Sequence, residues 1–156
     1  MSKEMVTNTY KEYLDRIRDE ILCNKAIKPT DIKMMNPLVL AYVGDSVYET
    51  FVRTFLVTSG QAHVSKLHKM SVEFVKAKAQ AEILAKISEL LTEEEQDIVR
   101  RGRNTKSATV PKNADISDYR YATGFEALIG FLYLTGQLDR LIALVEAIVN
   151  IKLESV

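Results

Sequence analysis

The sequence has few of the residues on which small secreted proteins and zinc proteins depend. Its 156 residues include one cysteine, Cys23, three prolines, six glycines and no tryptophan. A single cysteine excludes a disulfide framework and any zinc site built from several cysteines, and it is typical of a reducing compartment. The sequence contains no run of about 18 apolar residues, which is the length that a membrane-spanning helix needs. Its charged N-terminus does not resemble a signal peptide. We therefore expect a cytoplasmic protein without a membrane partner.

Neither sign of charge is in excess. The 21 lysines and arginines balance 21 aspartates and glutamates. Such a chain has no overall attraction to nucleic acid, so a polyanionic partner would have to bind a local basic patch. The length and the 47% content of hydrophobic residues are typical of one globular domain with a single core.

The spacing of apolar residues predicts an all-α fold of about six helices, because strand-like alternation is almost absent. Two of these helices, over 36–58 and 115–135, are apolar on nearly all sides and are expected at the centre of the core. The long helix over 63–91 could be broken. The predicted helices cover residues 9–23, 36–58, 63–91, 92–101, 115–135 and 137–153. The residues expected to separate them are Pro29, Pro37, Gly60, Gly102, Pro111 and Gly136.

Two helix starts carry capping patterns. The Asn36 side chain can accept a hydrogen bond from a backbone N–H of the first turn, and Pro37 follows as the first helical residue. Thr92 and Glu95 have the spacing of a capping box, in which each side chain bonds to the backbone N–H of the other residue.

Each central helix carries one carboxylate on a face that looks buried or half-buried, Asp45 in the first and Glu126 in the second. A buried carboxylate costs several kcal/mol unless it is paired, protonated or bound to a metal, so each needs a partner. A structural ion pair, for example with Arg53, or a more exposed position would satisfy either acid. Two carboxylates from two core helices can instead hold Mg²⁺ together with water and phosphate oxygens.

Three glycines lie inside the same helices, at Gly44, Gly124 and Gly130. A glycine in the middle of a helix costs about 1 kcal/mol relative to alanine. Their presence indicates either the close approach of two helices or a backbone that lies next to a ligand.

The segment from 100 to 112 contains several basic residues and no acid. Residues 101–117 lack an apolar period, so we predict a loop of about fifteen residues there, which leads into the helix with Glu126. Arginine forks, ammonium groups and neutral hydrogen-bond donors suit the oxygens of a sugar-phosphate backbone. A solvated basic loop that binds nothing is the alternative.

Four stretches, in order along the chain, resemble Mini-ribonuclease III, a branch of the ribonuclease III family without a double-stranded-RNA-binding domain. At the centre of the first, residues 43–47 are similar to the Leu-Gly-Asp-Ser-Val core of the family's signature helix. The stretches are NPLVLAYVGDSVYE at 36–49, RGRNTKS at 101–107, PKN at 111–113 and YRYATGFEALIG at 119–130.

The resemblance implies an all-α ribonuclease III fold and a homodimer that cleaves double-stranded RNA with Mg²⁺, for which Mn²⁺ can substitute. It also implies that the substrate is the large-subunit ribosomal RNA precursor. A ribosomal protein is a further candidate partner, which the sequence does not identify. Asp45 and Glu126 match the catalytic, metal-binding acids of the family. On this basis residues 30–156 form the catalytic domain and residues 1–29 an N-terminal helical extension. The residues expected to grip the RNA backbone are Arg101, Arg103, Asn104, Lys106, Lys112 and Lys78.

The sequence departs from the wider ribonuclease III pattern at three positions that are usually acidic, Leu38, Ala41 and Thr123. The acidic set is thereby reduced to Asp45 and Glu126, so metal affinity is expected to depend more on the RNA phosphate. Two alternatives stay open. One is a catalytically silent scaffold that binds structured or ribosomal RNA, and the other is a helical protein-interaction module.

Overall fold

The computed structural model describes residues 3–17, 19–20, 27–60, 63–106 and 109–154. In these residues the chain forms eight α-helices and one short 3₁₀ helix, and no strand. The helices are α1 (Lys3–Ile17), α2 (Pro29–Met34), α3 (Pro37–Thr58), α4 (Val64–Val75), α5 (Ala77–Ile87), η2 (Ser88–Leu90), α6 (Glu93–Asn104), α7 (Ile116–Leu134) and α8 (Leu138–Glu154). The all-α prediction is confirmed. Within the described ranges no helix is both long and apolar enough to cross a membrane.

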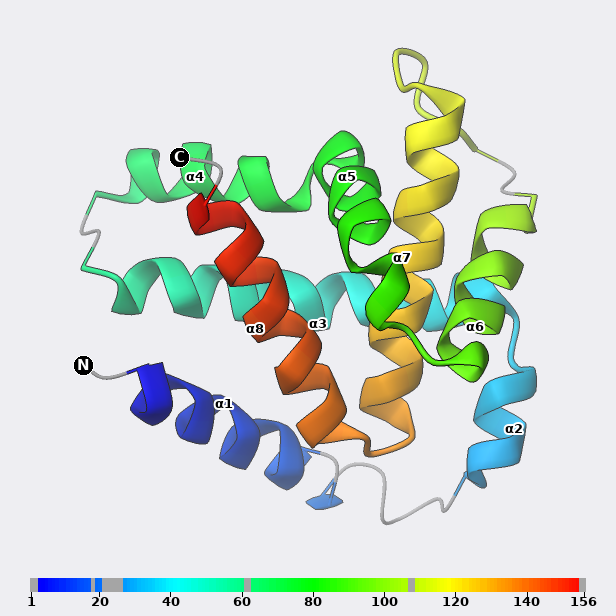
Figure 1. Cartoon of the computed structure of the whole chain (residues 1–156), viewed down its shortest axis with the longest axis horizontal. Coiled ribbons are helices and arrows are strands. Elements are labelled where there is room, and N and C mark those ends of the chain that lie inside the picture. Colours follow the sequence, from blue (N-terminus) through cyan, green and yellow to red (C-terminus); the bar gives the residue numbers. More distant parts are fainter. Residues whose placement is uncertain (1–2, 18, 21–26, 61–62, 107–108, 155–156) are drawn as a thin grey trace.

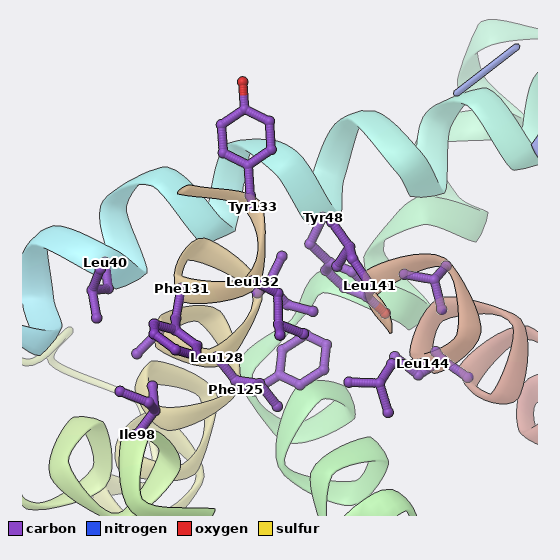
Figure 2. Close-up of a cluster of buried hydrophobic side chains, with 14 of the residues drawn as sticks. Leu40, Tyr48, Ile98, Phe125, Leu128, Phe131, Leu132, Tyr133, Leu141 and Leu144 are labelled. Carbon is purple, nitrogen blue, oxygen red and sulfur yellow. The ribbon is translucent and has the colours of Figure 1, made fainter. Parts of the chain in front are cut away.

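Helix α7 is the centre of the fold. Figure 1 shows it running across α3, with α5 and α6 on either side, and it also packs on α8. Every residue from Ala122 to Tyr133 is buried except Glu126. The apolar side chains of α7 fill the space between the surrounding helices, where Phe125 meets the ring of Tyr48 edge-to-face with 4.8 Å between centroids (Figure 2). Burial on nearly all sides explains why this helix has almost no polar face.

Glycine lets α3 and α7 approach until their backbones touch. A Cβ atom on Gly44 would lie 1.8 Å from the carbonyl oxygen of Glu126, and one on Gly130 would lie 1.9 Å from that of Leu40. Both distances are far below van der Waals contact, so no side chain fits at either position. These two glycines therefore serve close helix packing, which is one of the two explanations that the sequence left open.

A second pair of glycines joins α6 to α7. A Cβ atom on Gly124 would lie 2.7 Å from the carbonyl oxygen of Val99, and one on Gly102 would lie 2.8 Å from the Cα of Gly124. The prediction that Gly102 separates two helices is wrong, because Gly102 lies buried inside α6, which ends at Asn104. The loop before α7 is correspondingly shorter than predicted, and its Ser107 lies outside the described residues.

The capping predictions are confirmed. The Asn36 side chain accepts a hydrogen bond from a backbone N–H of the first turn of α3 at 2.9 Å. Thr92 and Glu95 form the complete capping box of α6. Gly60 and Gly136 follow α3 and α7 with positive φ angles of 91° and 71°, a conformation that favours glycine at a helix end.

One further helix was not predicted, and the break that the sequence allowed in the long helix is present. Pro29 begins a helix of 6 residues, α2, which the apolar spacing did not predict. The predicted helix over 63–91 breaks at Lys76, whose extended backbone (φ −61°, ψ 147°) separates α4 from α5. This break turns α5 so that it can pack on α7.

Helix α1 packs on α8 and contributes to the same core. Leu14 is buried, and Lys11 Nζ donates a hydrogen bond to the Asp139 carboxylate at 2.6 Å. This helix begins at Lys3, before the predicted start at Thr9, and the predicted end at Cys23 lies outside the described residues. The division into an extension over 1–29 and a domain from residue 30 onward stays a prediction.

We expect Gly44→Ala to lower the free energy of unfolding by about 3 kcal/mol or more, because the new Cβ overlaps the backbone of α7. Urea denaturation followed by circular dichroism measures this loss. Gly60→Ala is the matched control, since its Cβ has open space and only the positive φ opposes it, at about 1 to 2 kcal/mol. Equal losses in the two variants would contradict the backbone contact.

Candidate active site

Asp45 and Glu126 meet where α3 crosses α7. Asp45 directly follows Gly44, the glycine that admits the Glu126 backbone, so the crossing brings the two side chains together. Their carboxyl groups hydrogen-bond to each other. Glu126 is half-buried, as its helical face predicted, whereas Asp45 is solvent-exposed, which is the alternative that the sequence left open for either acid. The pair therefore opens on the surface of the protein.

The two acids share a proton near neutral pH. Burial raises the pKa of Glu126 to about 7, and the negative charge of Asp45 contributes to that rise. Although the Asp45 residue is exposed, partial removal of its carboxyl from water and the neighbouring Glu49 raise the pKa of Asp45, whereas the hydrogen bond from Glu126 opposes this increase. The pair as a whole therefore holds a proton more tightly than two isolated carboxylic acids would. The repulsion between the two acids is relieved either by this proton or by a cation.

No basic side chain neutralises the pair in the described structure. Arg53, the ion-pair partner considered for Asp45, donates instead to Glu49 at 2.5 Å. Across the described ranges neither acid takes part in a salt bridge, and no group of three or more His, Cys, Asp or Glu side chains forms a metal cluster. Two facing carboxylates without a basic partner fit a divalent ion that keeps several of its own waters, as Mg²⁺ does.

Gln80 is a third polar residue at this site, and it was not predicted from the sequence. It belongs to α5 and is 1% exposed, and its amide interacts with the Glu126 carboxylate, which lowers the pKa of Glu126 against the effect of burial. The sequence did contain a signal, because Gln80 lies three and seven residues before Ile83 and Ile87 on an apolar stripe. A polar side chain on such a stripe needs a polar partner in the core.

The predicted RNA-binding residues lie on accessible parts of α5, α6 and the segment after α6. Asn104, Lys106, Lys112 and Lys78 are exposed, and Arg103 is partly exposed. The basic character predicted for this surface is therefore available to solvent.

Two arginines of α6 have defined positions. Arg103 lies over the ring of Tyr121, with 5.4 Å between its Cζ and the ring centroid, which orients the guanidinium without neutralising its charge. Arg101 instead donates to the carbonyl oxygens of Lys33 at 2.5 Å and Met35 at 3.0 Å. Arg101 thus fastens the end of α2 to α6, and two of its five N–H donors are used inside the protein.

Comparison with known proteins agrees with this geometry. The family described as Ribonuclease III domain matches residues 38–137. The Mini-ribonuclease 3 of Clostridium tetani is 51% identical over 126 residues, which cover 80% of this chain and 83% of that protein. The chain belongs to the ribonuclease III family. The resemblance to the Mini-ribonuclease III branch is confirmed, and the chain is an endoribonuclease.

Further similarity covers both sequence and fold. The Mini-ribonuclease 3 of Staphylococcus aureus is 48% identical over 122 residues, or 77% of this chain and 91% of that protein. The crystal structure of a protein from Fusobacterium nucleatum has a TM-score of 0.68 and 32% sequence identity, over 80% of this chain and 97% of that one. The expected ribonuclease III fold is therefore confirmed.

The three positions at which the sequence departs from the wider ribonuclease III pattern carry no carboxylate in this protein. Ala41 is buried, Leu38 is partly buried, and the buried Thr123 hydroxyl donates to a backbone carbonyl of α7 at 3.0 Å. None of the three supplies a charged ligand. Any metal held here therefore depends on Asp45 and Glu126 for its protein carboxylates.

We expect the Glu126 carboxyl of the metal-free protein to titrate near pH 7, and Asp45→Asn to lower that midpoint because it removes a charge that raises it. Carbon-13 NMR of the glutamate carboxyl groups measures the midpoint. Glu49→Gln is the matched control, since Glu49 acts on Asp45 and its loss should leave the Glu126 midpoint nearly unchanged. A wild-type midpoint near the ordinary value of 4.5 would contradict the shared proton.

The same raised pKa determines how stability depends on pH. Because the folded-state pKa of Glu126 lies above its ordinary value of 4.5, the folded protein binds this proton more tightly than the unfolded chain does. The contribution of Glu126 to the free energy of unfolding therefore rises as the pH falls from about 7 toward 4.5. A divalent cation competes with this proton, so its affinity should rise with pH over the same range.

Proposed function

We propose that this chain cleaves double-stranded RNA at the pair formed by Asp45 and Glu126, with a divalent cation, Mg²⁺ or in its place Mn²⁺. The observation that carries the proposal is the contact between two carboxylates from different core helices, with no basic partner in the described residues. Membership of the ribonuclease III family supports hydrolysis of an RNA phosphodiester as the reaction. A bound Mg²⁺ supplies charge neutralisation at the phosphate, a more acidic water and stabilisation of the leaving 3′-oxygen.

The two acids have different tasks in this proposal. Asp45 is exposed, so it is the carboxylate that an RNA duplex can reach, and the half-buried Glu126 lies behind it. Both must be ionised to hold a cation, so the proton that they share has to leave for solvent. Because the pKa of Glu126 is about 7, activity should increase with pH through the neutral range.

The exposed basic surface supplies the affinity for RNA. Contacts to phosphates and 2′-hydroxyl groups would recognise the A-form shape of the duplex, because its major groove is too narrow for side chains to read. Arg101 supports this surface from inside the protein, through its hydrogen bonds to the end of α2. The residues that we propose to contact RNA directly are Arg103, Asn104, Lys106, Lys112 and Lys78.

The assembly that we propose is a cytoplasmic homodimer in which each subunit cuts one strand, since one site cannot cut both strands at a fixed offset. On α3, Val39 is 50% exposed and Tyr42 is 82% exposed, and these apolar side chains offer contact area for a second subunit. The substrate that the family resemblance favours is the large-subunit ribosomal RNA precursor, with a ribosomal protein as an accessory partner.

We expect the wild type to cut a long RNA duplex in Mg²⁺ at low salt, and EDTA to abolish the cleavage. Asp45→Asn should still bind the duplex but cut it at least about 100-fold more slowly, because it removes a metal-binding carboxylate. Asp139→Asn changes an exposed aspartate on α8 and is the matched control, with cleavage expected at the wild-type rate. If wild type and Asp45→Asn both bind and neither cuts, with several metals and a ribosomal precursor, the RNA-binding scaffold becomes the better explanation.

We expect Arg103→Ala and Arg101→Ala to separate RNA binding from stability. Arg103→Ala should reduce the slope of log binding constant against log salt concentration by about one, which corresponds to one lost phosphate contact. It should lower the free energy of unfolding by less than about 1 kcal/mol. Arg101→Ala should lower the free energy of unfolding by about 1 to 3 kcal/mol, because two carbonyl groups lose their donor. Filter binding over a salt series and urea denaturation measure the two effects. If Arg103→Ala mainly lowered the free energy of unfolding and Arg101→Ala mainly reduced the salt dependence of binding, the two assigned roles would be wrong.

A further inference from the structure

Gln80 has a buried oxygen atom that the described structure leaves without a partner. The side chain lies in the core at 1% exposure, and its Nε2 donates a hydrogen bond to the backbone carbonyl of Val75 at 3.0 Å. Its Oε1 is the one buried side-chain oxygen or nitrogen atom, among the residues described, that has no hydrogen-bond partner. Most buried polar atoms are paired, so an exception of this kind indicates a missing ligand or water.

The orientation of the Gln80 amide follows from its backbone contact. The carbonyl of Val75 can only accept a hydrogen bond, so the amide nitrogen must face it and the amide oxygen must face away. Gln96 makes the same contact five residues back along the chain, because its Nε2 donates to the carbonyl of Leu91 at 3.1 Å. Gln96 is exposed, however, so water can satisfy its oxygen. The buried oxygen, and not the backbone contact, is what distinguishes Gln80.

The Gln80 amide lies beside the acidic pair. It interacts with the carboxylate of Glu126 and favours its ionised form, which is the form that binds a cation. Asp45 completes the same group through its hydrogen bond with Glu126. One neutral amide and two carboxylates therefore meet at one place, from α5, α7 and α3.

We propose that Gln80 is a positioning residue of this site, whose Oε1 accepts a hydrogen bond from a water molecule bound to the divalent cation that Asp45 and Glu126 hold. This inference rests on the proposed function, because it assumes that the acidic pair binds a cation. The buried oxygen has no hydrogen-bond partner among the described residues, and a cation on the ionised pair would displace the Glu126 proton and leave a bound water as the donor. Mg²⁺ and Mn²⁺ retain waters in sites with few protein ligands, and these waters donate hydrogen bonds.

An amide suits this position better than a third acid. The two carboxylates already repel each other enough to share a proton, so a further negative charge in the core would add to that repulsion. An amide oxygen orients a bound water without adding charge. Some groups orient metal ligands from outside the inner coordination sphere. Removing such a group typically weakens metal binding by about one to two orders of magnitude.

Binding of Mn²⁺ to the RNA-free protein, followed by the electron paramagnetic resonance signal of free Mn²⁺, tests the proposal without any measurement of cleavage. We expect Gln80→Leu to raise the Mn²⁺ dissociation constant about tenfold or more, because it removes the acceptor of the bound water. Gln96→Leu is the matched control, since it loses the same kind of backbone contact, and it should bind Mn²⁺ as the wild type does. Equal affinities for Gln80→Leu and Gln96→Leu, with both folded by circular dichroism, would overturn the proposal.

A measurement on the wild type decides the question if Gln80→Leu does not fold. With nitrogen-15 in the glutamine side-chain amides, we expect a small amount of bound Mn²⁺ to broaden the Gln80 amide signal beyond detection, because the paramagnetic ion would lie one water molecule away. A Gln80 signal that stays sharp while Mn²⁺ is bound would overturn the proposal. Cleavage by the wild type and its loss in Asp45→Asn test the proposed function separately. If the wild type cleaves RNA but substitution of Gln80 leaves the Mn²⁺ affinity unchanged, only this inference is contradicted.

Discussion

The fold and the acidic pair both depend on the backbone contact between α3 and α7. Gly44 and Gly130 have no side chains, so the two helices cross with the Glu126 and Leu40 carbonyl groups where Cβ atoms would otherwise lie. A helix that is surrounded this closely can place a polar side chain only where the crossing leaves access to the surface. Glu126 occupies that place, and Asp45 reaches it because it follows Gly44 in the sequence.

The electrostatics of the site follow from this geometry. Packing against α3 partly removes Glu126 from water and places it next to Asp45, and both effects favour a bound proton. A proton, a cation or a basic side chain can relieve the repulsion, and the described residues supply no basic side chain there. With only two carboxylates at the site, and none from Ala41 or Thr123, the protein supplies few charged ligands. RNA phosphate oxygens would then complete the site, which couples metal binding to substrate binding.

Local sequence patterns predicted the elements that depend on local contacts. The start of α3 followed from Asn36, and the start of α6 followed from the capping box of Thr92 and Glu95. Tertiary contacts decided the features that were missed. Gly102 was predicted at a helix end because glycine is common there. Its actual constraint is the close approach of Gly124, which lies on another helix and cannot be identified from the local sequence.

The same division holds within the candidate site. Asp45 and Glu126 were identified from the sequence, but the exposure of Asp45 depends on which face of α3 the rest of the chain covers. Gln80 was missed because its partners lie across the break between α4 and α5 and on α7. Arg101 was expected at the RNA surface, and only the position of α2 shows that it bonds to that helix.

The most direct test is an anomalous difference map from crystals grown with Mn²⁺ and a short RNA duplex. We expect a Mn²⁺ peak at the carboxylates of Asp45 and Glu126, with an RNA phosphate beside it. A duplex bound elsewhere on the protein, or a duplex against these acids with no Mn²⁺ between protein and phosphate, would contradict the proposed metal-dependent cleavage.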